Sequence, residues 1–185
     1  MSSMKAYSDR YRTGEKALTK KEYEKLMSVV DVLEDEVMIK LAVSTGARRE
    51  DLCNIKVSDI NLEDKKVHFY EKKKDRIWTV PLSSEMCRLI KQLLNTRGKK
   101  QVETLVSYSG RTAYRRLHKY CDRAGIPRRP FHALRGTCIK FCQAAGWTPE
   151  QVSKLTGDTI QVIQEHYATP STSEMQEVAE SKAFI

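Results

Sequence analysis

Long apolar runs, a signal peptide, paired cysteine motifs and internal repeats are all missing from this sequence. Because a bilayer-crossing helix needs about 20 apolar residues, we do not expect a membrane protein. The five cysteines are odd in number and include no C-x-x-C pair. Cys138 and Cys142 are four residues apart, as on one helix face. We expect these cysteines to be reduced and to pack in the core as small hydrophobic residues of a cytosolic protein, with a metal site as the alternative.

The size and charge of the chain narrow its class further. Its 185 residues fit one domain, and 40% apolar residues can fill a core. The net charge of +9 and the pI of about 9.3 indicate a polyanionic partner. Since nothing favours a membrane, the expected partner is nucleic acid in the cytoplasm of a host cell.

The positive charge is concentrated in the middle of the chain. Between Arg111 and Arg135 eight residues are basic and only Asp122 is acidic. We expect this stretch to contact the DNA backbone, which provides affinity and register rather than sequence choice. The predicted contacts are Arg111, Arg115, Arg116, Lys119, Arg128 and Arg129, with Lys72 and Lys74 from an earlier cluster.

Helix signals predominate along the chain. Residues 1–17 are polar without periodicity, which predicts a linker or a frayed start. A capping box of Thr19 and Glu22 begins the first helix. Residues 67–70 and 76–80 alternate as two strands of a hairpin with a charged turn. Further helices are expected at 35–44, 49–55, after Ser83 or Ser84, and at 111–124, 132–145, 149–156, 159–167 and 172–182. The predicted fold class is mainly α with a small antiparallel β-sheet (α+β).

Four short patterns follow one another along these elements. They are Thr45-Gly46-Ala47-Arg48, the lysine-rich hairpin ending in Val80-Pro81-Leu82, His132-Ala133-Leu134-Arg135, and Leu155-Thr156-Gly157-Asp158 with Tyr167 nine residues later. Each pattern alone is a weak signal, but all four in this order are jointly specific.

In this order and spacing the patterns resemble the catalytic domain of tyrosine recombinases, which include phage and archaeal virus integrases and bacterial recombinases that resolve chromosome dimers. The resemblance covers about residues 18–167. It implies the tyrosine recombinase fold over residues 18–170 and a tail helix at 171–185. It also implies double-stranded DNA as the partner and a reaction without metal or other cofactor.

The resemblance implies that Arg48 and Arg135 clamp the scissile phosphate. Cleavage of a phosphodiester builds negative charge on its oxygens, and the planar fork of an arginine binds two oxygens at once. Asp51 occupies the place of a glutamate that supports the first arginine in the family. Taken alone, Arg48 and Asp51 also have the spacing of an ordinary surface pair.

Tyr167 is the implied nucleophile, and a tyrosine hydroxyl with a pKa of about 10 needs help to attack. His132 accepts its proton or hydrogen-bonds the phosphate. Lys73 best matches the hairpin lysine that protonates the leaving 5′ oxygen, with Lys72 and Lys74 as alternatives. The product is a 3′-phosphotyrosine, whose conserved bond energy permits rejoining without ATP.

Asp158 is the one clear departure, because the family usually has His or Trp at this catalytic position. An ionised aspartate cannot donate a hydrogen bond and repels a phosphate. Asp158 either faces away and holds a neighbour or is protonated in the site. Lys154, one turn earlier, is an alternative donor.

Other interpretations of these residues stay open. Lys72–Lys74 alone is typical of a solvated turn, His132 of a structural histidine and Tyr167 of a packing residue, although their joint occurrence favours catalysis. A type IB topoisomerase shares the chemistry but does not exchange partners. A non-catalytic DNA-binding accessory factor of the same fold also stays open, because Asp158 favours it.

The tail after Tyr167 has Met175, Val178 and Phe184 at roughly helical spacing. In the family such a tail docks on a neighbouring protomer, which implies a homo-oligomer, a tetramer on DNA. The alternative is that the tail packs on its own domain.

Overall fold

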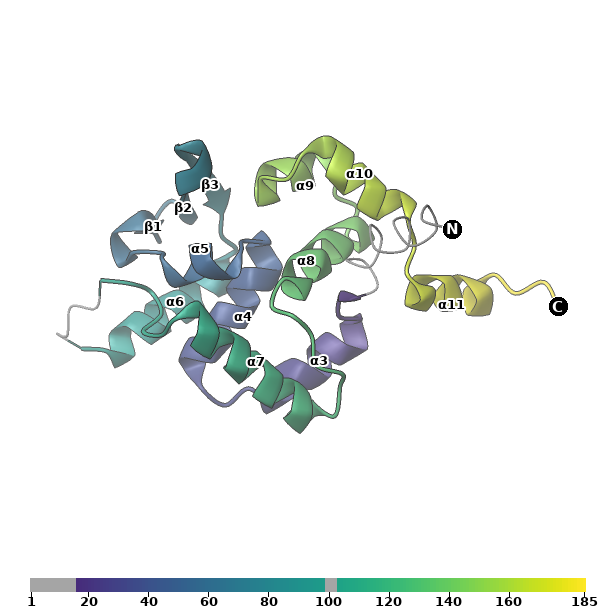
Figure 1. The fold of residues 1–185 in the computed structure, drawn as a ribbon, viewed down its shortest axis with the longest axis horizontal. Helices are drawn as coiled ribbons and strands as arrows, with labels where there is room; N and C mark the ends of the chain where they lie inside the picture. The colour runs from purple at the N-terminus through teal and green to yellow at the C-terminus, as the bar shows by residue number, and fades with distance from the viewer. Residues whose placement is uncertain (1–15, 99–102) are drawn as a thin grey trace, which may run out of the picture.

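The computed structural model describes residues 16–98 and 103–185 (Figure 1). It is mainly helical with one small antiparallel sheet, so the predicted class is confirmed. The predicted linker at 1–17 falls almost wholly outside the described residues, and the domain bounds stay a prediction. The helices are α3 Lys20–Val29, α4 Leu33–Thr45, α5 Arg49–Cys53, α6 Ser84–Thr96, α7 Gly110–Ala124, α8 Ala133–Ala144, α9 Pro149–Thr156, α10 Ile160–Ala168 and α11 Thr172–Ser181.

Local signals set the starts of several helices, as predicted. The Thr19 hydroxyl accepts a hydrogen bond from the backbone N–H of Glu22, whose side chain accepts one from the backbone of Thr19, which completes the capping box of α3. Ser83, rather than Ser84, caps α6. Thr148 caps α9 with proline at the next position. The helix expected at 49–55 is shorter and ends at Cys53.

The sheet has the order β1-β2-β3, with strands Ile60–Asn61, Lys66–Glu71 and Arg76–Pro81. The β2–β3 hairpin was predicted, but β1 was not, because two residues carry no alternation. A short 3-10 turn, η2 Lys72–Lys74, closes the hairpin. Asp75 follows it with a left-handed φ of 43°, and the Tyr70 hydroxyl donates to the Asp75 carboxylate at 2.8 Å. The charged turn is therefore an ordered one.

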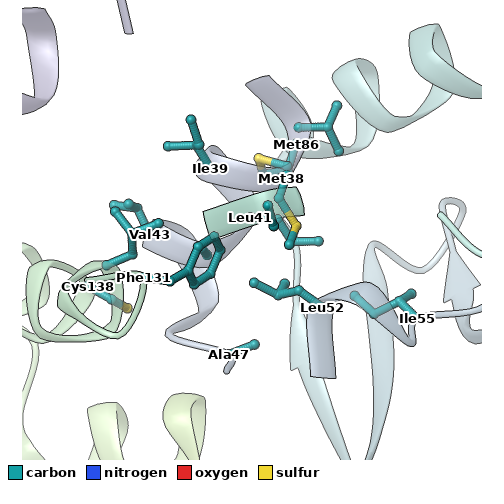
Figure 2. Packing of buried hydrophobic residues seen from close by; sticks show 14 of the residues in the cluster. Met38, Ile39, Leu41, Val43, Ala47, Leu52, Ile55, Met86, Phe131 and Cys138 are labelled. Carbon is teal, nitrogen blue, oxygen red and sulfur yellow. The ribbon is translucent and has the colours of Figure 1, made fainter. Parts of the chain in front are cut away.

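Helix α4 is the centre of the hydrophobic core. Its residues from Val37 to Val43 are buried, except for Lys40, and the helix packs against α6 and α8. Figure 2 shows Met38, Leu41 and Val43 of this helix among the side chains of neighbouring elements. Cys138 and Cys142 of α8 are buried as free thiols, which confirms their predicted packing role.

The β2–β3 hairpin and the α9–α10 pair lie next to each other, because Arg76 of β3 donates a hydrogen bond to the carbonyl of Gly157 at the end of α9. Helix α10 packs on α8 and α9, and α3 packs on α7. In Figure 1 the hairpin and the α9–α10 pair are neighbours along the upper side of the molecule, and α11 projects away from the body. No helix in the described part of the chain is both long and apolar enough to span a bilayer.

Candidate active site

A broad open groove of about 1380 Å³ lies between α5, the β2–β3 hairpin and the residues before α8. Arg48, His132, Lys72 and Lys74 line it, so the fold brings four predicted residues to one surface. Arg135, Asp158 and Tyr167 are not among its lining residues. The carboxylates along it belong to Glu50, Asp51, Asp59, Glu71 and Glu103.

Arg48 lies directly before the first turn of α5, with its side chain about half exposed at 49%. The turn that places it depends on Gly46, which ends α4 with a left-handed φ of 67°. A Cβ at this position would lie 2.8 Å from Cγ2 of Thr156. Both the backbone angle and this contact therefore require glycine here.

Asp51 lies in α5, three residues after Arg48, and the charge of Arg48 acts on its carboxyl. Its Oδ2 is buried and has no hydrogen-bond partner among the described residues. Burial raises the pKa of Asp51, the charge of Glu71 adds to this effect, and the charge of Arg48 opposes it. The predicted role of Asp51 as a support of Arg48 stays a prediction.

Glu71, at the end of β2, gathers three basic side chains. Its Oε2 accepts a hydrogen bond from Nε of Arg76 at 2.7 Å. Its Oε1 lies 3.6 Å from Nη1 of Arg48 and 3.7 Å from Nζ of Lys74. Burial alone would raise the pKa of Glu71, but Arg76, Lys74 and Arg48 together lower it. The carboxylate is therefore ionised and links the hairpin to the first predicted arginine.

Arg76, which is paired with Glu71, also connects the hairpin to the turn after α9. Its Nη2 donates to the carbonyl of Gly157 at 3.3 Å, in the turn directly before Asp158. Lys72 and Lys74 lie on the exposed surface of the hairpin turn. The backbone of Lys73 belongs to the same turn, and its catalytic role stays a prediction.

Arg135 lies in the first turn of α8 and is almost fully buried, at 4% exposed. Its Nε and Nη2 donate to Oδ2 and Oδ1 of Asp158 at 2.9 and 2.8 Å. Its Nη2 and Nη1 also donate to the carbonyls of Thr156 and Gly46. Burial alone would raise the pKa of Asp158, but the hydrogen bonds and charge of Arg135 lower it. Of the two predicted alternatives, the geometry favours an ionised Asp158 that holds a neighbour.

His132 precedes α8 and keeps its ring accessible at the groove. Partial desolvation lowers its pKa below 6.5, and the charges of Arg135 and Arg48 lower it further against the opposing charge of Asp158. The pKa of His166 is lowered too, first by burial. A neutral His132 ring at physiological pH is able to accept a proton.

Tyr167 lies near the end of α10, with its hydroxyl donating to the carbonyl of Trp147 at 2.7 Å. Burial raises its pKa, and the nearby thiols of Cys142 and Cys138 add to this effect. The hydroxyl is thus protonated at neutral pH and bonded to the backbone before α9. Its role as the nucleophile stays a prediction.

The six predicted DNA-contacting residues between Arg111 and Arg129 fall into two groups. Arg111, Arg115 and Lys119 are exposed at four-residue spacing on α7 and form no ion pair with any described residue. The remaining three arginines have internal partners, which leaves fewer donors for a phosphate. These are Arg116 with the buried Asp35 at 2.9 Å, Arg128 with Asp122 at 2.7 Å and Arg129 with Glu22 at 3.0 Å. Their contacts with DNA stay predictions.

Glu71, Arg76 and Lys140 were not among the residues predicted from the sequence. Glu71 follows Val67 and Phe69 at two-residue spacing on the buried face of β2, and this alternation was a usable signal. Lys140 lies on the buried face of α8. The apolar residues next to it on that face were the signal in the sequence that its side chain is buried. Within residues 16–98 and 103–185 no group of three His, Cys, Asp or Glu side chains is placed to bind a metal ion.

Comparison with curated proteins identifies relatives among archaeal recombinases. The tyrosine recombinase XerA of Pyrococcus horikoshii is 27% identical over 180 residues, which cover 92% of this chain and 62% of the relative. XerA of Saccharolobus solfataricus is 28% identical over 142 residues, which cover 77% and 48%. The chain therefore spans less than two thirds of the length of these relatives.

Solved structures confirm the predicted tyrosine recombinase fold. The crystal structure of XerA recombinase superimposes with a TM-score of 0.75 at 21% identity, over 90% of this chain and 65% of that one. XerH bound to palindromic difH substrate gives a TM-score of 0.72 at 18% identity, over 91% and 52%. Residues 16–174 match the phage integrase family. Since that match takes in most of the chain, from before α3 into α11, this protein belongs to the phage integrase family.

Proposed function

We propose that this chain is the catalytic part of a site-specific DNA recombinase, an integrase, that cleaves and rejoins DNA strands through a 3′-phosphotyrosyl intermediate. One observation carries the proposal. Nη1 of Arg135 donates to the carbonyl of Gly46, only two residues before Arg48. Two arginines 87 positions apart in the sequence are thus linked through one turn, next to His132.

In the proposed reaction the oxygen of Tyr167 attacks the scissile phosphorus while its proton passes to neutral His132. The bond from phosphorus to the 5′ oxygen breaks, and Lys73 gives that oxygen a proton. Arg48 and Arg135 stabilise the charge that develops on the phosphate oxygens. Strand joining is the reverse attack by a 5′ hydroxyl, so the phosphotyrosine bond supplies the energy.

The chain without DNA is in a resting arrangement by this proposal. The side chain of an arginine has five N–H groups, and four of those of Arg135 are used in the described contacts. The hydroxyl of Tyr167 is hydrogen-bonded to the carbonyl of Trp147. In this proposal a phosphate bound between Arg48 and Arg135 competes with Asp158 for Arg135 and draws the nucleophile inward. Charge-assisted hydrogen bonds to the phosphate replace the hydrogen bonds that are broken. We therefore expect DNA binding itself to convert the resting arrangement into the active one.

A second candidate function has support from the same contacts. A non-catalytic DNA-binding factor of this fold does not need an arginine whose guanidinium is free to bind a phosphate. In this structure both carboxylate oxygens of Asp158 already accept hydrogen bonds from the guanidinium of Arg135. Arg48, His132 and Tyr167 have no purpose in such a factor, which is why the recombinase is preferred.

The deciding experiment uses nicked suicide duplexes, labelled at the 5′ end of the cut strand, with randomised sequence around the nick. Cleavage by a recombinase leaves the labelled strand attached to protein, which a denaturing gel reveals. We expect an adduct with the wild-type chain and none with Tyr167→Phe. Salt-sensitive DNA binding without any adduct would instead support the non-catalytic factor.

We further propose that the protein acts as an oligomer, a tetramer on double-stranded DNA, through its tail, in the cytoplasm of its host cell. Helix α11 has no buried residue, and Met175 and Val178 are about half exposed. This apolar face is not covered by the chain's own described residues, which favours docking on a neighbour. A sizing column run at rising concentration tests this, because elution as a monomer throughout contradicts it.

A further inference from the structure

Lys140 is a charged residue in an unusually buried place. It lies in the middle of α8 and is only 8% exposed. Its ammonium donates to the carbonyls of His166 and Thr169 at 3.0 and 3.1 Å, and to the carboxylate of Glu174 at 3.0 Å. These three acceptors use all three donors of a lysine, so the buried charge is fully satisfied.

The acceptors of Lys140 lie on both sides of the nucleophile in the sequence. Helix α10 ends at Ala168, and the last carbonyls of a helix have no partner within it. A cation near these carbonyls stabilises them and the negative end of the helix dipole. Gln143, one turn further along α8, donates to the carbonyl of Tyr167 at 3.2 Å. The backbone around Tyr167 is therefore held from α8.

The same helix carries Arg135 in its first turn. Lys140 follows it by five residues, so one continuous helix holds both the second arginine and the end of α10. The distance between Tyr167 and Arg135 thus depends on how firmly the residues of α8 hold that end. Within the described part of the chain neither Arg135 nor Asp158 bonds to Lys140, which separates this attachment from the Arg135–Asp158 pair.

We propose that Lys140 is a positioning residue for the nucleophile. It fixes the backbone of residues 166–169 relative to Arg135, and through Glu174 it joins the start of α11 to the same point. This inference rests on the proposed recombinase function, since it assigns Lys140 to the reaction of Tyr167. Lys140 itself touches no reacting atom.

The first test separates DNA binding from cleavage. We expect Lys140→Met to leave the affinity for a duplex unchanged while slowing adduct formation by roughly 100-fold, because a small misplacement of a reacting group has that effect. Lys140→Arg, which keeps the charge and the donors, is expected to restore most of the rate. Lys91→Met, an exposed lysine on α6, is the matched control and should behave as wild type. An equal loss of affinity and rate in Lys140→Met overturns the proposal, since it indicates general damage.

The second test does not require an active enzyme. Hydrogen exchange of backbone amides should speed up in residues 160–174 of Lys140→Met, while the amides of α7 keep their wild-type rates. Unchanged exchange in 160–174 overturns the proposal even if the wild-type chain forms no adduct. Failure of the recombinase proposal alone appears as absence of adduct in wild type, so the two failures are distinguishable.

Discussion

The carboxylate of Asp158 meets the guanidinium of Arg135 in a two-bond contact, with Nε–Oδ2 at 2.9 Å and Nη2–Oδ1 at 2.8 Å. This is the geometry with which an arginine also binds two phosphate oxygens. Asp158 therefore occupies, in the chain without DNA, the fork that the proposed reaction needs. The residue that departs from the family pattern at this position thus forms an ion pair that joins α8 to the turn after α9.

Removal of the Asp158 carboxylate should destabilise the fold. In Asp158→Ala the buried Arg135 loses the only anionic partner that the described chain gives it, and breaking a buried pair from one side costs on the order of 3 kcal/mol. Urea unfolding followed by circular dichroism measures this loss. Short duplex DNA should raise the free energy of unfolding more in the variant than in wild type, because a phosphate can bind the guanidinium that Asp158 no longer occupies. Equal unfolding midpoints for Asp158→Ala and wild type would contradict the prediction.

Neutralising Glu71 should slow catalysis without unfolding the protein. Glu71→Gln removes the only carboxylate that forms ion pairs with Arg48, Lys74 and Arg76 in the described chain, so Arg48 is no longer held in its orientation. We expect adduct formation to fall about 10-fold, consistent with removal of one charged interaction worth about 1.4 kcal/mol. Glu85→Gln is a matched control, because Glu85 pairs with Arg88 at 2.7 Å on the exposed face of α6. Identical rates for both variants would refute the role of Glu71.

The exposed basic stripe of α7 should control the salt dependence of DNA binding. When one phosphate interaction is removed, the slope of log affinity against log salt concentration becomes shallower by about 0.9. Replacing Arg111, Arg115 and Lys119 together with alanine should therefore weaken binding and flatten this slope, as fluorescence anisotropy can measure. Arg128→Ala is expected to have a smaller effect, because Asp122 already pairs with Arg128. A slope unchanged in the triple variant would place the DNA elsewhere.

The pH dependence of cleavage should report the lowered pKa of His132. As proton acceptor His132 must be neutral, so the rate falls as pH falls through its pKa, which lies below 6.5. The pKa of Tyr167 is raised, so the hydroxyl stays protonated and depends on that acceptor throughout the neutral range. Single-turnover adduct formation from about pH 5 to 8 should show an acid limb below 6.5 that His132→Gln abolishes. A limb at higher pH, or one that persists in the variant, argues against His132 as the acceptor.

Much of the fold was predictable because its signals are local. Thr19, Ser83 and Thr148 start helices through bonds to residues three positions away, and such bonds depend on short spacing alone. The hairpin followed from alternation and a charged turn. Strand β1 was missed because its pairing of Ile60 with Val67 depends on a neighbouring strand rather than on its own sequence.

The sequence by itself determined the class, the helix starts and the residue types of the site, since spacing and order along the chain carry that information. Only the tertiary structure decided which partners those residues have. The bonds of Asp158 with Arg135, of Tyr167 with Trp147 and of Lys140 with the end of α10 and with Glu174 join residues 20 to 34 positions apart. Such contacts depend on how helices pack, and a charged side chain that is buried takes whichever donor or acceptor the packing brings within reach.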